Sequence, residues 1–184
     1  MAEKKDLTEH FVAGDLVYDG ALLKVRRDQV RLPDGSPGVR EYIRHPGAVA
    51  IVALFEDGSV LLERQFRYPA GAHFYELPAG KLEPDEPPLE TARRELQEET
   101  GYVAAEWREL GRVHPCVGYS NETIDFFLAR KLEFKGAQLD EGEFLETLRL
   151  PLAEGLDWIR RGRISDTKTI LGLFWAEKIL SEAW

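Results

Sequence analysis

The amino-acid sequence predicts an α/β fold in which helices cover both faces of a mixed β-sheet. Two observations lead to this fold class. Short strand-like runs fill the first third of the 184-residue chain, and a clear helix is then followed by more strands and two closing helices. Strands and helices that mix in this order are typical of a layered α/β domain. We expect a strand-rich, antiparallel extension at residues 1–47 and a larger domain at residues 48–184.

Composition narrows the class of protein. Hydrophobic residues make up 43% and charged residues 31%, which is an ordinary globular balance. The net charge of 24 − 33 = −9 argues against a nucleic-acid partner. The single cysteine, Cys116, excludes an internal disulfide, and the four histidines do not combine with it into a zinc cluster. With no leader-like start and no apolar run of spanning length, we expect a cytoplasmic protein without a membrane partner.

The first third of the chain contains short β-prone runs separated by turn dipeptides. Asp19-Gly20 and Asp34-Gly35 supply the turns. The runs occupy residues 16–18, 22–25, 29–32 and 39–43. This extension has too few apolar residues for a core of its own, so we expect it to pair with another chain.

The next segment predicts the central strands. Residues 48–55 are continuously apolar, which is typical of a strand buried on both faces. Asp57-Gly58 then predicts a hairpin turn into residues 60–66. Residues 74–80 read as a strand that runs into a loop.

A helix is predicted over residues 87–100. Two prolines suit its first turn and Gly101 is placed to end it. Its apolar side chains at Leu89, Ala92 and Leu96 share one face. Strands follow at residues 106–113, 123–132 and 144–150, and helices at residues 152–161 and 167–183, the last with Asp166 as its N-cap.

Acidic residues concentrate in two short segments, residues 80–102 and 138–146, each with a net charge of −4. In the first, Glu95, Glu98 and Glu99 stand at i, i+3 and i+4, so their carboxylates project from one helical face and repel one another. Mg²⁺ or Mn²⁺, which prefer oxygen ligands, would offset that repulsion. Arg94 can orient one of the carboxylates. The ordinary alternative is a solvated acidic face.

The spacing of this segment resembles the Nudix box. The matching residues are Gly80, Glu86, Arg94, Glu95, Leu96, Glu98, Glu99 and Gly101. Only Tyr102 departs, because the family usually has a bulky aliphatic residue there. The resemblance implies an α/β/α sandwich around a mixed sheet, and an enzyme that hydrolyses a diphosphate linked to another moiety with the help of a divalent metal.

Segments outside the box resemble the ADP-ribose pyrophosphatase subfamily. They are residues 64–68, 76–83, 140–144 and 162–166, with Lys168-Thr169. The resemblance implies a small-molecule nucleoside diphosphate sugar as substrate, with ADP-ribose, cleaved to AMP and ribose 5-phosphate, as the best choice. It also implies a homodimer joined through the N-terminal extension. A GDP-mannose-type sugar, a dinucleotide and a non-catalytic Nudix-fold sensor remain alternatives.

The resemblance also implies roles for the acids of the box. Glu95 and Glu99 would bind the metal, Glu98 would share or bridge it, and the backbone carbonyl of Ala79 would be a further ligand. Glu83 could hold a water or sense the metal in the substrate site, or be an exposed loop acid. Glu86 is expected to be structural.

The general base is predicted outside the helix. Glu143 matches the loop glutamate with this role in the subfamily, and Gly142 gives its loop freedom to close over a substrate. Glu141 is the rival for the role. A solvated acidic turn is the alternative for both.

Arginines at the end of a predicted strand are candidates for phosphate binding. Arg64 and Arg67 are an odd number of residues apart and face opposite sides of a regular strand. We favour Arg67 as the clamp, against an ordinary surface ion pair. Arg44 is a similar candidate, and Glu122 lies where the family places a loop facing the ribose and phosphates. Aromatic side chains that could hold the base, or simply pack in the core, are Tyr18, Tyr42, Phe74 and Trp107.

Overall fold

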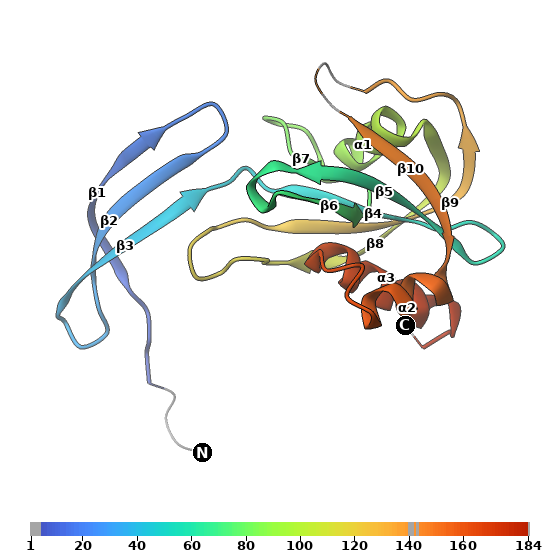
Figure 1. The fold of residues 1–184 in the computed structure, drawn as a ribbon. Helices are drawn as coiled ribbons and strands as arrows, with labels where there is room; N and C mark the ends of the chain where they lie inside the picture. Colours follow the sequence, from blue (N-terminus) through green and yellow to red (C-terminus); the bar gives the residue numbers. More distant parts are fainter. Residues whose placement is uncertain (1–4, 140–141, 143, 184) are drawn as a thin grey trace. The chain divides into compact units, whose positions relative to one another are not determined.

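The computed structural model describes residues 5–139, 142 and 144–183. In it the chain forms two compact units (Figure 1). One contains the described residues up to His45 together with Cys116–Glu122, and the other contains Pro46–Pro115 and the described residues from Thr123 onward. The division expected between residues 47 and 48 stays a prediction.

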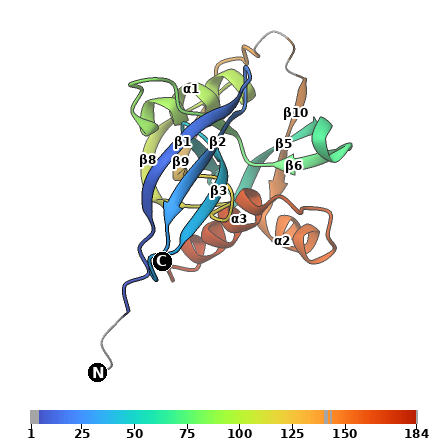
Figure 2. The same ribbon diagram turned by 90° about the vertical axis from the view of Figure 1, so that its left-hand side faces the viewer.

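The smaller unit is built on an antiparallel three-stranded sheet in the order β1-β2-β3 (Figure 2). Its strands are β1 (His10–Asp19), β2 (Lys24–Arg31) and β3 (Pro37–Arg44). The antiparallel extension is therefore confirmed, although two of the expected short runs merge into β2. Asp28, only 7% exposed, accepts a hydrogen bond from the Tyr42 hydroxyl at 2.9 Å and another from Arg26 Nη2 at 3.1 Å, which ties β2 to β3.

The larger unit contains two sheets. A mixed four-stranded sheet has the order β7-β4-β9-β8, with β4 and β9 parallel and the other pairs antiparallel. A three-stranded antiparallel sheet has the order β10-β5-β6. The strands are β4 (Ala48–Ala53), β5 (Ser59–Arg67), β6 (Ala72–Glu76), β7 (Ala79–Lys81), β8 (Tyr102–Val113), β9 (Ile124–Phe134) and β10 (Leu145–Pro151), with a 3₁₀ turn, η1 (Tyr68–Ala70), between β5 and β6.

The predicted hairpin at Asp57-Gly58 was wrong in its strand pairing. The turn forms, and Phe55 N donates to Ser59 O at 2.9 Å. Only one isolated bridge, Leu54 to Val60, then joins the two segments, and β4 and β5 continue into different sheets. Each strand finds another partner, because β4 lies between β7 and β9, and β5 lies between β10 and β6.

Helices cover both faces of the four-stranded sheet, as the sequence predicted (Figure 1). They are α1 (Pro88–Thr100), α2 (Leu152–Arg160) and α3 (Thr167–Leu180). Alternate residues of β4 point to opposite sides. Val49 and Ile51 pack in the cluster that contains Leu96 of α1, whereas Val52 packs in the cluster that contains Leu173 of α3. In the described part of the chain no helix is long and apolar enough to cross a membrane.

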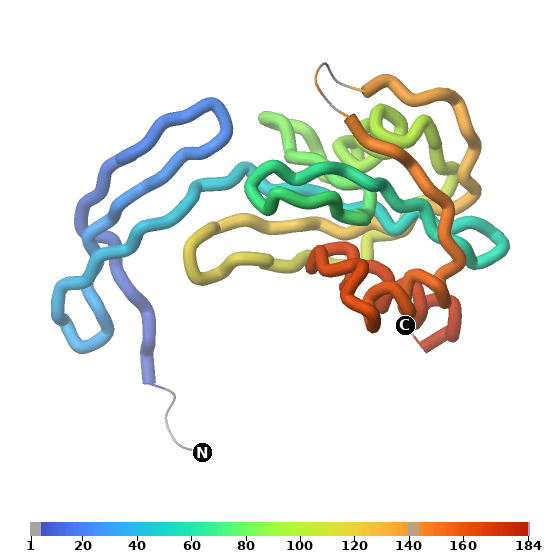
Figure 3. The backbone as a smooth tube through the Cα atoms, in the orientation of Figure 1, coloured from blue at the N-terminus to red at the C-terminus, as the bar shows by residue number. Residues whose placement is uncertain are grey.

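The ends of α1 form much as its flanking residues predict. Pro87 is the N-cap with extended backbone angles, and Gly101 ends the helix in the left-handed region at φ 75°. Before α1, the chain leaves β6, passes through Leu77 and Pro78 and enters β7 in the other sheet (Figure 3). This crossing places β7 beside α1 and prepares the candidate site.

Candidate active site

The acidic face of α1 lies against the backbone of β7. The Glu99 side chain is buried, with 7% of the residue exposed, and its Oε2 accepts a hydrogen bond from the backbone N–H of Ala79 at 3.1 Å. A carboxylate this deep in a protein is stable only with such partners. The contact fixes Glu99 next to the residue whose carbonyl the sequence analysis named as a ligand.

Gly80 gives the second contact between β7 and α1. A Cβ built on Gly80 would lie 1.9 Å from both Cδ and Oε1 of Glu95. The carboxylate of Glu95 therefore occupies space that any other residue at position 80 would fill. This close approach is the physical reason for a glycine at the start of the motif.

Arg94 binds three carboxylates at once. Its Nε and Nη2 form a fork with Glu86, at 3.1 and 3.0 Å. Its Nη1 donates to Glu95 Oε1 and to Glu98 Oε2, both at 2.9 Å. Hydrogen bonds to Glu86, and then to Glu98, raise the pKa of Arg94 above its ordinary value. Arg94 therefore remains charged and offsets the repulsion between the acids of α1.

Glu86 anchors the loop before α1. It accepts the fork from Arg94 and a hydrogen bond from the Thr91 hydroxyl at 2.8 Å. These bonds, the one from Arg94 first, hold the pKa of the Glu86 carboxyl below its usual value. Glu86 thus joins the loop to the helix rather than facing the other acids as a free group.

The donors around β7 and α1 suit a hard divalent cation. Glu95, Glu98 and Glu99 offer carboxylate oxygens, and Ala79 offers a backbone carbonyl beside them. Among the described residues, no three acidic, histidine or cysteine side chains are already arranged as a metal-binding group. The donor chemistry fits Mg²⁺ or Mn²⁺, while the guanidinium of Arg94 supplies the positive charge between Glu95 and Glu98.

Arg64 and Arg67 take different partners at the end of β5. Arg64 Nη1 donates to Glu146 at 3.0 Å on the neighbouring strand β10. Arg67 donates to Glu76 of β6 through Nε at 2.7 Å and Nη2 at 2.9 Å. The side chain of Arg67 is 47% exposed, so it remains open to a ligand while Glu76 holds it.

The remaining predicted residues belong to other parts of the chain than α1. Glu83 is exposed in the loop after β7. Arg44 and Glu122 belong to the smaller unit. Glu143 and its rival Glu141 lie outside the described residues.

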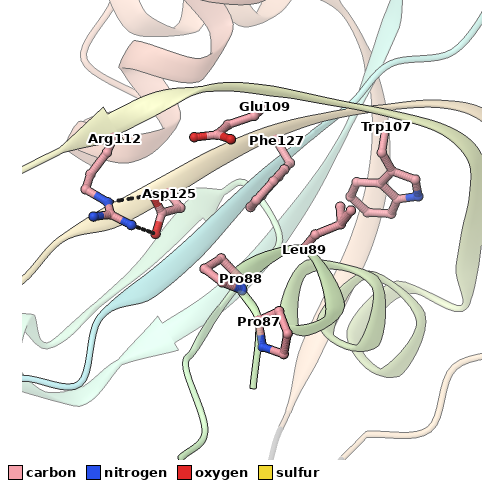
Figure 4. Close-up of a pocket in the computed structure, with 8 residues that line it drawn as sticks. All are labelled: Pro87, Pro88, Leu89, Trp107, Glu109, Arg112, Asp125 and Phe127. Atoms are coloured by element: carbon pink, nitrogen blue, oxygen red, sulfur yellow. Dashed lines mark hydrogen bonds and ion pairs between the residues drawn. The ribbon is translucent and has the colours of Figure 1, made fainter. Parts of the chain in front are cut away.

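The four aromatic candidates have varied surroundings. Trp107 lines a pocket of about 330 Å³ beside the first turn of α1 (Figure 4), and its Nε1 donates to Ala104 O at 3.1 Å. Tyr42 bonds to Asp28 in the smaller unit. Tyr18 is 58% exposed and Phe74 is half-buried. The pocket is lined by Pro87, Pro88, Leu89, Trp107, Glu109, Arg112, Asp125 and Phe127.

The sequence did not single out two residues that lie around Arg67 at the end of β5. Glu76 and Lys168 were noted only as parts of longer similar segments, yet they bond to each other and Glu76 bonds to Arg67. The two are 92 positions apart. No local spacing pattern connects them, although Glu76 and Lys168 each stand in a segment that resembles the subfamily.

Comparison with known proteins identifies the class. Residues 44–168 match the NUDIX domain, and residues 15–43 match the nucleoside diphosphate sugar hydrolase N-terminal domain. The chain therefore belongs to the Nudix hydrolase family. Members of this family generally depend on divalent metals.

Individual relatives resemble most of the chain. A methanol dehydrogenase activator from Bacillus methanolicus is 38% identical and an ADP-ribose pyrophosphatase from Bacillus subtilis is 36% identical, each over 90% of both chains. A GDP-mannose pyrophosphatase from Shigella flexneri is 35% identical over 89% of this chain and 84% of the relative. The crystal structure of an ADP compounds hydrolase shares the fold, with a TM-score of 0.85 and 23% identity over 97% of this chain and 98% of the other.

Proposed function

We propose that this enzyme hydrolyses the diphosphate bond of a nucleoside diphosphate sugar in the presence of Mg²⁺ or Mn²⁺. ADP-ribose, cleaved to AMP and ribose 5-phosphate, is the substrate we favour. The single observation that carries the proposal is the set of oxygen donors formed where Ala79 and Gly80 meet Glu99 and Glu95. The match at residues 15–43 and the name of the Bacillus subtilis relative support the substrate class.

The metal would be held by Glu95, Glu99, Glu98 and the carbonyl of Ala79. When bound, it would neutralise the diphosphate, polarise its phosphorus–oxygen bonds and lower the pKa of a coordinated water. Arg94 keeps Glu95 and Glu98 oriented from one nitrogen. These carboxylates would therefore lose little side-chain freedom on binding the metal.

Other residues would bind the substrate or take the proton of the attacking water. Arg67 would clamp a phosphate from the end of β5, and Glu143 would act as general base for the attacking water. Glu83, Arg44 and Glu122 would contact the substrate or its waters. Charge supports the first role, because a guanidinium group attracts a phosphate and donates charge-assisted hydrogen bonds to it.

The working form we propose is a cytoplasmic homodimer. Large apolar side chains of β1 stand exposed, among them Phe11 at 63%, Val17 at 56% and Tyr18 at 58%. Such a patch supports association with a second copy. The only cysteine, Cys116, is free, which suits a reducing compartment.

A GDP-mannose-type sugar is the second candidate substrate. The Shigella relative named GDP-mannose pyrophosphatase is 35% identical to this chain, against 36% for the ADP-ribose pyrophosphatase. A dinucleotide would use the same diphosphate chemistry. The acids of α1 would act on the diphosphate, which all these substrates share. The choice among them therefore depends on the residues that contact the base and the sugar.

A substrate panel tests the proposal. The purified protein is incubated with Mg²⁺ and, separately, with ADP-ribose, GDP-mannose, UDP-glucose, NADH and diadenosine polyphosphate, and the products are separated by ion-exchange chromatography. We expect ADP-ribose to give the largest kcat/KM, with AMP and ribose 5-phosphate as products. Preferred hydrolysis of GDP-mannose would replace the substrate but keep the class, and no hydrolysis of any compound would reject the proposal.

A further inference from the structure

Two buried carboxylates face each other beside the candidate site. Glu63 of β5 and Glu76 of β6 are directly opposite in the strand register. They are 3% and 4% exposed. Burial of a charged carboxylate carries a desolvation cost unless it is paired and hydrogen-bonded. Glu76 therefore needs positive charge close by.

Two cations meet at Glu76. Arg67 binds both carboxylate oxygens, with Nε on Oε1 and Nη2 on Oε2. The ammonium of Lys168 binds Oε2 as well. Burial raises the pKa of the Glu76 carboxyl, but the hydrogen bonds from Arg67 and the charge of Lys168 outweigh it, and the pKa falls below its usual value. Glu76 is thus a charged acceptor shared by both cations.

Lys168 is itself fixed by the first turn of α3. Its side chain is only 13% exposed, and its Nζ also lies 3.1 Å from Asp166 Oδ2. The same oxygen of Asp166, the N-cap, accepts from the backbone N–H of Thr169 at 2.9 Å. Thr169 in turn accepts from the backbone N–H of Leu77 at 2.8 Å. The turn therefore braces the segment that leads from Glu76 into β7.

The shared carboxylate leaves one end of Arg67 available. Nε and Nη2 are used by Glu76, and within the described residues Nη1 donates to no protein acceptor. The hydrogen bond to Glu76 raises the pKa of Arg67 above its usual value, and the charges of Glu99 and Asp166 add to this effect. Glu76, which holds Arg67, is three residues before Ala79, whose backbone N–H donates to Glu99, so Arg67 lies near the acidic face of α1.

We propose that Lys168 is a positioning residue that, by balancing the charge of Glu76, keeps Arg67 oriented with Nη1 free to bind the substrate diphosphate. This inference rests on the proposed function. Without Lys168, Glu76 would stand opposite Glu63 with Arg67 as its only cation. The carboxylate would then shift or take up a proton, and the fork that orients Arg67 would be lost.

Replacing Lys168 should weaken substrate binding and leave the chemical step largely unchanged. Among the described residues, the ammonium of Lys168 bonds to Glu76 and Asp166, neither of which belongs to the acidic face of α1. Lys168→Met should therefore raise KM about tenfold, the value of a lost charge-assisted hydrogen bond, with kcat changed far less. Lys168→Arg should restore part of the affinity.

The matched control is Lys178→Met. Lys178 belongs to the same helix, is 53% exposed and is paired only loosely, at 3.9 Å, with Glu177. Its removal should leave KM and kcat unchanged. Calorimetric binding of a methylene-bridged, non-hydrolysable ADP-ribose analogue with Mg²⁺ provides a readout besides turnover, and affinity should fall about tenfold for Lys168→Met only.

A double-mutant cycle with Arg67→Met decides whether Lys168 acts through Arg67. The KM increase caused by Lys168→Met should disappear in the Arg67→Met background. An equal increase in both backgrounds would overturn the inference and indicate direct contact with the diphosphate. A lower melting temperature with unchanged KM would overturn it in favour of a purely structural role.

The experiment still tests the inference if a variant does not fold, and it distinguishes failure of the inference from failure of the proposed function. Lys168→Gln replaces the methionine variant in the same cycle if that variant does not fold. Hydrolysis by the unmodified enzyme tests the proposed function, whereas the inference is tested by the difference between variants. An active enzyme with an unaffected Lys168→Met variant would reject the inference alone.

Discussion

Gly80 shows how a single hydrogen in place of a side chain shapes the candidate site. The backbone of Gly80 does not adopt the left-handed conformation, because its φ is not positive. What it provides is room for the carboxylate of Glu95, 1.9 Å from where a Cβ would stand. A carboxylate at the end of a flexible side chain can move aside, so the cost of a larger residue should fall on function.

Gly80→Ala should therefore lower turnover by about 100-fold, the effect of displacing a catalytic group by an ångström, with little change in melting temperature. Steady-state kinetics and thermal denaturation measure the two quantities. Gly155→Ala in α2 is the control, because its added methyl would meet the side chain of Leu173 in α3 at 3.3 Å. Wild-type turnover for Gly80→Ala would contradict the role of this contact.

The general base is the other prediction at the scale of the residue. Glu143→Gln should lower kcat about 100- to 10,000-fold while KM changes little, because a base acts in the transition state. Glu141→Gln should be far milder. Rapid-quench or steady-state kinetics of both variants give the ranking. The reverse order would move the role to Glu141, and near-normal rates for both would return it to the helix, with Glu98 next.

At the scale of elements, some features of the fold follow from local patterns and others do not. Pro87, Pro88 and Gly101 predict the ends of α1, and the structure confirms them to within a residue. The turn at Asp57-Gly58 also forms. Its strands separate into two sheets because each gains a longer partner, and sequence spacing holds no information about that competition.

In the candidate site, too, some contacts follow from local sequence patterns and others do not. Glu95, Glu98 and Glu99 share a helical face by periodicity alone, so the sequence predicts their proximity. The pair of Glu76 and Lys168 depends on packing α3 against β6, across 92 positions. Such a contact arises from the assembled fold, and a short-range pattern carries no trace of it.

The N-cap of α3 gives a prediction about an element. Asp166 accepts from the backbone N–H and the hydroxyl of Thr169, at 2.9 and 2.6 Å. Asp166→Ala should lower the free energy of unfolding by about 1 kcal/mol, as expected for a lost cap. Urea denaturation measures it, with Asp157→Ala, which removes two surface ion pairs, to Arg160 and Arg161, as the milder control. An equal loss of unfolding free energy in the two variants would contradict the role of Asp166 as an N-cap.

At the scale of the whole molecule, the exposed apolar side chains of β1 predict association. Multi-angle light scattering should give the mass of a dimer. Replacing Phe11 and Val17 together with glutamate should lower the dimer fraction, because charges would be forced into an apolar contact. Tyr68→Glu, at a residue 87% exposed in η1, is the control. A monomer of concentration-independent mass for the unaltered protein would contradict the dimer.

The proposed activity depends on the acidic face of α1 acting as a metal-dependent hydrolytic centre. Its most direct test is the rate of ADP-ribose hydrolysis in excess EDTA and after Mg²⁺ is restored, measured for the unaltered enzyme and Glu99→Gln. We expect no activity in EDTA and recovery with Mg²⁺ only for the unaltered enzyme. Glu99→Gln should melt normally, because glutamine can still accept from Ala79 N. Full activity in EDTA, or a Glu99→Gln protein that unfolds yet keeps normal specific activity in its folded fraction, would contradict the account.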